Sequence, residues 1–164
     1  FPRSGYVRLK GVSPAYNKKI EAVVMIPWLL FRYGEVLLNY VEALNEYSPG
    51  HSDILKYLNM IRNRAGLPNI ASGKSQSEMR KLIRHERRVE LCGERLRYYD
   101  TRRWLIAEQV EQGPFYGMDV SQNGNAFYKR TVFETRVWRK EFYLFPIPQS
   151  EIDKNKNMVQ NPGW

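Results

Sequence analysis

Two glutamates, Glu86 and Glu90, have the type and spacing that could perform chemistry. They lie four residues apart in a segment with helical periodicity, so a helix would place them on one face. A retaining glycosidase holds its two catalytic carboxyl groups about 5–5.5 Å apart. The spacing of residues i and i+4 on a helix gives a similar separation. One hypothesis is therefore a glycan-acting hydrolase that uses Glu86 and Glu90 as acid and nucleophile.

The neighbours of this pair favour a structural interpretation. On a helical wheel Met79, Leu82 and Ile83 form one apolar stripe, and the two glutamates fall in its middle. Buried charges persist when they are paired, because an isolated one costs several kcal/mol. We expect the opposite face to be covered by basic residues, namely Arg80, Lys81, Arg84, Arg87 and Arg88.

The following helical segment repeats this anomaly. Asp100 and Arg103 fall within an apolar stripe made by Leu96, Tyr99, Ile106 and Ala107. Arginines that could neutralise the glutamates lie nearby in sequence, at positions 62, 64, 102 and 103. We therefore predict a structural ion network between neighbouring helices, formed by Glu86, Glu90, Asp100, Arg62, Arg102 and Arg103.

Other chemistries lack a matching pattern. The two histidines, His51 and His85, have no acidic or cysteine neighbours at metal-ligand spacing, so we expect no metal site and no cofactor. No Ser-His-Asp or Cys-His arrangement has a motif around it. The single cysteine, Cys92, cannot form an internal disulfide, and we expect it to be a small buried side chain near a helix end.

Composition narrows the function classes. The 164 residues carry a net charge of +9, which invites a nucleic-acid interpretation. The basic excess is concentrated in residues 80–103, where one exposed helix face and internal pairing account for it, and no nucleic-acid-binding motif accompanies it. We expect no nucleic-acid partner. No apolar run reaches the 18 residues or so that would indicate a membrane span.

Hydrophobic periodicity predicts four helices. The first covers 28–47 with Leu30, Tyr33, Leu37, Tyr40, Val41 and Leu44 inward, and the second covers 52–65, capped by Ser52 and ended by Gly66. Together they form a helical hairpin of the kind seen in tetratricopeptide repeats. The third, 76–92, begins at a capping box of Ser75 and Glu78, and the fourth covers 94–108.

The remaining segments are not helical in pattern. Residues 1–26 have the composition of an irregular or extended segment. Asn123-Gly124 is a turn signal between two candidate strands, 116–121 and 126–134. In the proline-rich end, 143–164, we expect a proline-fixed extended stretch and then an acidic-capped turn with little regular structure, in a tail that lies against the helices. The predicted fold class is mainly α, with helical hairpins and a small β-hairpin.

Aromatic side chains offer a possible binding surface for sugars. Tyr33, Tyr40, Tyr57 and Tyr99 lie on helix stripes and are expected in the core. The better candidates for stacking on sugar rings lie in or beside the hairpin: Phe115, Tyr116, Tyr128 and Trp138, with Asn123 and Asn125 as polar neighbours. A packed hairpin face explains these residues equally well.

Four segments, taken together, resemble the C-terminal part of the RagB/SusD family, the nutrient-capturing outer-membrane lipoproteins of Bacteroidetes. In the family's order they are FRYGEVLLNYVEALNE (31–46), LNMIRNRAGLP (58–68), IRHERRVELCGERLRYYDTRRW (83–104) and YLFPIPQSEIDKNKNMVQNPGW (143–164). Two positions depart from the family pattern. Arg95 stands where glycine is usual, and Thr101 where leucine is usual; both look tolerable.

The resemblance implies a protein that binds ligands and does not catalyse. It implies capture of a glycan, oligosaccharide or peptide at the cell surface beside a SusC-like TonB-dependent transporter in the outer membrane. Residues 1–164 would form the C-terminal portion, because the four segments match that part of the family and the chain has only about the last third of the family's usual length. The family's N-terminal part, with its signal peptide and lipid anchor, would then be a missing partner. A structural or interaction module with a basic docking face remains a further alternative.

Overall fold

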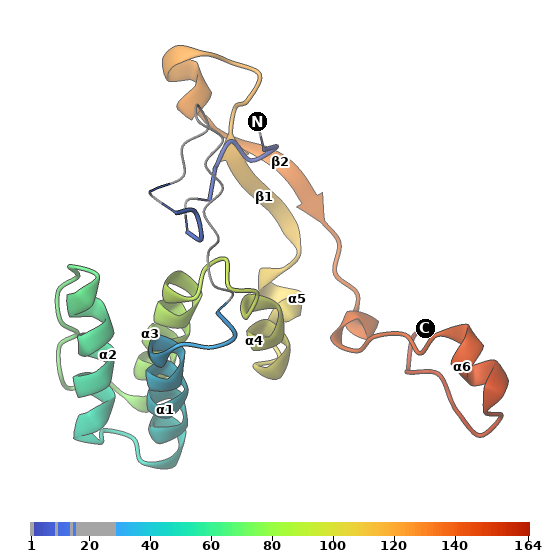
Figure 1. Ribbon diagram of the computed structural model, residues 1–164, viewed down its shortest axis with the longest axis horizontal. Coiled ribbons are helices and arrows are strands. Elements are labelled where there is room, and N and C mark those ends of the chain that lie inside the picture. Colours follow the sequence, from blue (N-terminus) through green and yellow to red (C-terminus); the bar gives the residue numbers. More distant parts are fainter. Residues whose placement is uncertain (1, 9, 14, 16–28) are drawn as a thin grey trace. The chain divides into compact units, whose positions relative to one another are not determined.

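The computed structural model describes residues 2–8, 10–13, 15 and 29–164, and Figure 1 shows its helices and strands. The chain forms two compact units. The helical unit comprises Lys10–Arg97, and the hairpin unit comprises Phe1–Leu9 with Tyr98–Trp164. The predicted fold class is confirmed, since helices predominate and two strands form a small antiparallel sheet.

The helical unit is built on three helices, α1 (Tyr33–Tyr47), α2 (Ser52–Arg64) and α3 (Gln76–Glu90). A short loop joins α1 to α2, and α1 packs against both α2 and α3 (Figure 1). Full burial of a side chain such as leucine or isoleucine contributes about 1.5–3 kcal/mol. The buried core consists of Leu37, Leu38, Val41, Ile54, Leu58, Ile61, Met79, Ile83 and Leu91.

Local sequence signals set most ends of these helices. The predicted capping box at the start of α3 is confirmed, because the side chains of Ser75 and Glu78 each bond the other residue's backbone N–H. Gly66 follows α2 with φ 72°, a conformation that glycine adopts without strain. The predicted cap of α2, Ser52, is wrong, because Ser52 is the first residue of the helix. His51 precedes the helix and its Nδ1 accepts a hydrogen bond from the backbone N–H of Asp53 at 3.2 Å.

The start of α1 differs from the prediction. The helix begins at Tyr33 rather than at position 28, which lies outside the described residues, and Arg32 before it is extended. The expected inward positions of Leu30, Tyr33 and Tyr40 are wrong, since all three are exposed. Leu30 precedes the helix, so the wheel does not apply to it. The Tyr40 hydroxyl instead donates to Asp53 at 3.2 Å.

The predicted fourth helix is interrupted. The chain forms α4 (Arg97–Arg103) and the short α5 (Ala107–Val110) in place of one helix over 94–108. Two residues adopt positive φ angles, Arg95 at 68° and Leu105 at 53°, and each breaks the helical path. Such conformations cost a non-glycine residue about 1–2 kcal/mol. This explains why glycine suits position 95 better than arginine.

Two further burial predictions were wrong. Cys92 is exposed, because α3 ends at Glu90 and residues 91–95 form turns rather than the last turn of a helix. Tyr99 is also exposed, whereas Ala107 is fully buried as expected.

The sheet of the hairpin unit pairs β1 (Gly113–Met118) with β2 (Arg130–Arg136), with an irregularity in register between Phe115 and Tyr116. The strands are displaced from the predicted 116–121 and 126–134. The connection is longer than a two-residue turn and contains a 3-10 helix, η2 (Gly124–Tyr128). Asp119 stabilises this loop, because its carboxylate accepts hydrogen bonds from the backbone and hydroxyl of Ser121.

The C-terminal tail contacts α4, as expected. The ring of Phe145 stacks on that of Tyr98 with centroids 5.8 Å apart, and Arg102 Nε donates to the carbonyl of Phe142 at 3.2 Å. A 3-10 helix, η3 (Lys140–Tyr143), leads into the tail. The expected acidic-capped turn is the six-residue helix α6 (Gln149–Lys154), which has Pro148 rather than an acidic residue at its N-cap. Within the described part of the chain, every helix is too short or too polar to cross a membrane.

Candidate functional site

The two glutamates that could be reagents are both bonded to arginines. Glu86 is 4% exposed, and its Oε2 accepts a hydrogen bond from Arg62 Nη1 of α2 at 2.7 Å. Glu90 Oε1 accepts from Arg32 Nη1 at 2.6 Å and also from Arg64 Nη2. Three arginines from two segments, α2 and the residue before α1, thus engage the carboxylates of one helix.

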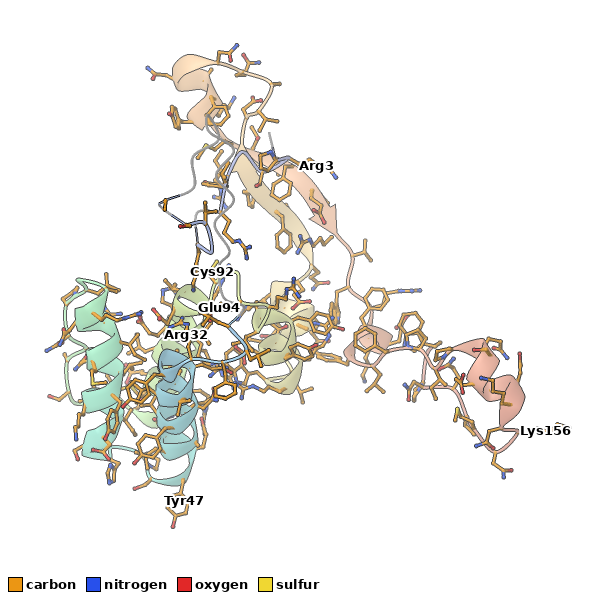
Figure 2. All side chains as sticks on the ribbon, viewed as in Figure 1. Arg3, Arg32, Tyr47, Cys92, Glu94 and Lys156 are labelled. Carbon is orange, nitrogen blue, oxygen red and sulfur yellow. The ribbon has the colours of Figure 1, made fainter. Side chains whose placement is uncertain are left out.

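Among the described residues of the helical unit, Arg32 lies at the centre of a cluster of ion pairs. Its Nε donates to Glu94 Oε2 at 2.9 Å, and its Nη2 donates to the backbone carbonyl of Glu90 at 2.8 Å. The ammonium of Lys10 donates to the same carbonyl at 2.6 Å and also pairs with Glu94. Figure 2 shows Arg32 and Glu94 together near the start of α1. We call Lys10, Arg32, Arg64, Glu90 and Glu94 the Arg32 cluster.

Gly34 makes room for this cluster. A Cβ atom at position 34 would lie 2.6 Å from Arg32 Nη1 and 3.3 Å from Glu90 Oε1. A larger residue would therefore push the guanidinium away from its carboxylates. Inside the cluster, burial alone would raise the pKa of Glu94, but the hydrogen bonds from Arg32 and Lys10 outweigh it and hold that pKa below its usual value.

The expectation that the basic residues of α3 face solvent fails at Arg87. This side chain is 4% exposed, and its Nη1 donates to Asn39 Oδ1 at 2.5 Å. Its Nε also lies 3.7 Å from Glu42 Oε2. Arg87 therefore connects α3 to α1 from inside the helical unit. Nearer the surface, Arg80 pairs with Glu46 at 2.5 Å.

The remaining residues of the predicted network lie in the hairpin unit and pair there. The buried Asp100 accepts from Arg103 Nη2 at 2.8 Å, and Arg102 pairs with Glu111 at 3.3 Å. The guanidinium of Arg102 also lies over the rings of Tyr98 and Trp138, at 3.4 and 5.0 Å from their centroids. The six predicted residues thus fall into separate groups. Two pairs form within the predicted set, Arg62 with Glu86 and Arg103 with Asp100, whereas Glu90 belongs to the Arg32 cluster and Arg102 pairs with Glu111.

The candidate sugar contacts fall into two groups. Tyr116 lies in β1, Tyr128 ends η2, and Asn123 precedes η2; all three are exposed at the loop end of the hairpin. Tyr128 is 71% exposed and makes an edge contact with Phe127, with centroids 5.3 Å apart. Val132 pairs with Tyr116 in the sheet and is also exposed. Tyr116 and Val132 thus expose paired apolar side chains on the sheet, and Tyr128 and Asn123 expose an aromatic and a polar side chain around η2, which are side-chain types that sugars contact.

Trp138 does not lie at the loop end of the hairpin. It follows the far end of β2, so about seven strand residues, or roughly 23 Å of extended chain, separate it from Tyr128. Its ring makes edge contacts with Phe142 and Tyr143 at centroid distances of 5.7 and 5.2 Å. Trp138 therefore packs with the start of the tail and is not brought together with Tyr116, Tyr128 and Asn123.

Comparison with known proteins identifies the family. The model of the SusD family matches residues 1–164. The chain belongs to the SusD family. The resemblance noted from the four motif segments is thereby confirmed.

Individual proteins similar to this chain support the assignment to the SusD family. SusD-like protein P2 of Formosa agariphila is 36% identical over 167 residues, which cover 97% of this chain and 29% of that protein. A crystal structure of a SusD-like protein from Bacteroides fragilis is 35% identical, with a TM-score of 0.74 over 84% of this chain and 26% of the other. Surface glycan-binding protein A from Bacteroides uniformis is 29% identical, with a TM-score of 0.54 over 80% and 26% of the two chains. The chain spans between a quarter and a third of each relative's length.

Proposed function

We propose that this chain is the C-terminal portion of a non-catalytic protein that captures a nutrient glycan or oligosaccharide. The protein acts at the cell surface, held to the outer membrane by a lipid anchor, and delivers its ligand to a SusC-like TonB-dependent transporter. Membership of the SusD family supports this role. So does the likeness to a surface glycan-binding protein of Bacteroides uniformis.

The observation that carries the proposal is the environment of Glu86. A glycosidase acid must bring its carboxyl group to the glycosidic oxygen of the substrate. Glu86 is 4% exposed and its carboxylate is bonded to Arg62, so it cannot meet a polysaccharide without local unfolding. Its neighbour Glu90 is engaged by Arg32 and Arg64. These contacts favour a scaffold role for the pair over hydrolysis.

Within this chain, the loop end of the hairpin supplies the ligand contacts. Tyr128, Tyr116 and Val132 expose apolar surface and Asn123 exposes a polar amide, and sugars need both kinds of contact. Trp138 is assigned a packing role instead, since its ring contacts Phe142 and Tyr143.

Replacing Tyr128 with alanine is expected to weaken glycan binding about tenfold, because an aromatic contact of about 1.5 kcal/mol corresponds to that ratio. The purified full-length protein is first screened on a glycan array, and the affinity for the retained glycan is then measured by titration calorimetry for wild type and variant.

The matched control is Tyr47→Ala. Tyr47 is 90% exposed at the end of α1, where Figure 2 shows it pointing away from the helix, so its loss removes an equally exposed tyrosine without touching the hairpin. Equal weakening by both variants would contradict the hairpin assignment. A full-length protein that binds no glycan on a broad array would contradict the proposed function and favour an interaction module.

A further inference from the structure

A cation covers one of the exposed aromatic rings of the hairpin. The guanidinium of Arg130 lies 3.7 Å from the centroid of the Tyr116 ring, and Arg130 itself is exposed. A ring with one face covered in this way has only its other face left for a sugar. Stacking orders the guanidinium, while its N–H groups stay available to an acceptor. Tyr116 therefore acts here as the support of an exposed cation.

A second arginine of the same sheet shows what is unusual about Arg130. Arg136 lies over Phe115 at 4.0 Å from the ring centroid, but its Nε also pairs with Glu134 at 2.7 Å. Within the described residues, Arg130 has no carboxylate partner within ion-pair distance. Two arginines are thus stacked on neighbouring rings of β1, and one of them keeps its full charge for an external group.

The surroundings of Arg130 add positive charge. Lys129 precedes it and is also exposed, with no ion-pair partner among the described residues. Arg3 donates to the backbone carbonyl of Phe133 on the same strand at 3.2 Å. Of the nearby acids, Glu134 pairs with Arg136, while Asp119 accepts from the neutral Ser121 and keeps its charge, so the three cations Arg3, Lys129 and Arg130 outnumber it. The loop end of the hairpin is therefore a cationic surface beside exposed aromatic rings.

We propose that this surface, formed by Lys129, Arg130 and Tyr116, binds an acidic saccharide, one that carries carboxylate or sulfate groups. A guanidinium forms two parallel hydrogen bonds with either group, and such charge-assisted bonds are stronger than those with neutral hydroxyls. Tyr128 and Val132 then contact the apolar C–H faces of the same sugar. The inference rests on the proposed function and narrows its ligand to a charged class.

The test uses the purified full-length protein and polysaccharides paired with neutral counterparts. Polygalacturonate with its carboxyl-reduced form reports on carboxylate, and dextran sulfate with dextran reports on sulfate. Chondroitin sulfate is paired with a desulfated, carboxyl-reduced form. Affinity electrophoresis is expected to show retention by at least one acidic polymer, at least tenfold stronger than by its neutral counterpart. Which pair responds identifies the anionic group.

Variants then test the assignment to Arg130. Arg130→Met is expected to weaken binding of the retained acidic polymer about tenfold, and Arg130→Lys to weaken it less, because lysine keeps the charge but loses the paired hydrogen bonds. The control is Arg88→Met, which removes the same charge from an exposed position of α3 in the other unit. Circular dichroism melting verifies that each variant is folded.

The outcomes separate this inference from the proposed function. Retention by neutral polymers only, or equal loss in Arg130→Met and Arg88→Met, overturns the inference and leaves glycan capture standing. Failure to bind any polymer of the panel overturns the inference, and failure on the broad glycan array as well overturns both.

Discussion

Replacing Arg62 with methionine is expected to lower the free energy of unfolding of the helical unit by about 3–5 kcal/mol. The reason is the partner left behind. The Glu86 side chain is 5% exposed, so without Arg62 its carboxylate would be a buried charge without its guanidinium. Arg62 also donates to the carbonyl of Pro68 at 2.9 Å, and this bond to the loop after α2 is lost as well. Urea denaturation followed by circular dichroism measures the change.

Substitution of the other member of the pair, Glu86, supplies the control. Glu86→Gln is expected to cost less than Arg62→Met, because the Arg62 side chain is 19% exposed and can be solvated when its partner is neutral. The double variant Arg62→Met with Glu86→Leu should recover much of the loss, since an apolar pair replaces buried charges well. Equal, small effects of both single substitutions would mean that the pair is not a desolvated one.

Replacing Arg32 with methionine is expected to lower the free energy of unfolding by about 2–3 kcal/mol, because hydrogen bonds to charged groups at the start of α1 are lost. Arg32 binds two carboxylates and one backbone carbonyl, which join α1, the end of α3 and the following turn. The matched control is Arg80→Met. Arg80 pairs with Glu46 in a more exposed position, where such a pair contributes about 0–1 kcal/mol.

The effect of Arg32 should depend on pH in a defined direction. The pKa of Glu94 is held below its usual value in the folded protein, with burial opposing and the bonds from Arg32 and Lys10 prevailing. A depressed carboxyl pKa contributes stability that is present above the unfolded value, about 4.3, and is lost as the pH falls through the folded value. The stability difference between wild type and Arg32→Met should therefore shrink below about pH 4. A difference that grew on acidification would contradict this account.

Periodicity and capping signals predicted the features that depend on residues close together in sequence, namely helix ends and inward helix positions. The capping box at Ser75 and the inward positions of Leu37, Leu58 and Ile83 follow from local spacing, and the structure has them. The positions of Glu86 and Glu90 on the apolar side of α3 also follow from the wheel. Arg62 and Arg64 were named as candidate partners and bind these carboxylates, but Arg32 was not, because it precedes α1 and lies 58 residues before Glu90. No local pattern encodes such a pairing.

The errors have the same origin. Arg87 looked exposed on the wheel, yet it is buried because α1 offers Asn39 and Glu42 opposite it. The helix predicted over 94–108 is interrupted where Arg95 and Leu105 adopt positive φ. Non-glycine residues rarely adopt this conformation, so residue type did not predict it. At the hairpin, Tyr116 and Tyr128 stay predicted sugar contacts, chosen for their aromatic type and their place in the predicted hairpin. The stacking of Arg130 on Tyr116 depends on strand register, which the irregularity at Phe115 and Tyr116 shifts.

The most direct test of the central claim measures retention and cleavage of one polysaccharide by the same protein. The full-length protein is incubated with a glycan that it retains, and reducing ends are quantified over time beside the bound fraction. Capture by a scaffold whose carboxylates are held by arginines predicts stable retention with no reducing ends above the protein-free control. A steady release of reducing ends that Glu86→Gln abolishes would contradict it.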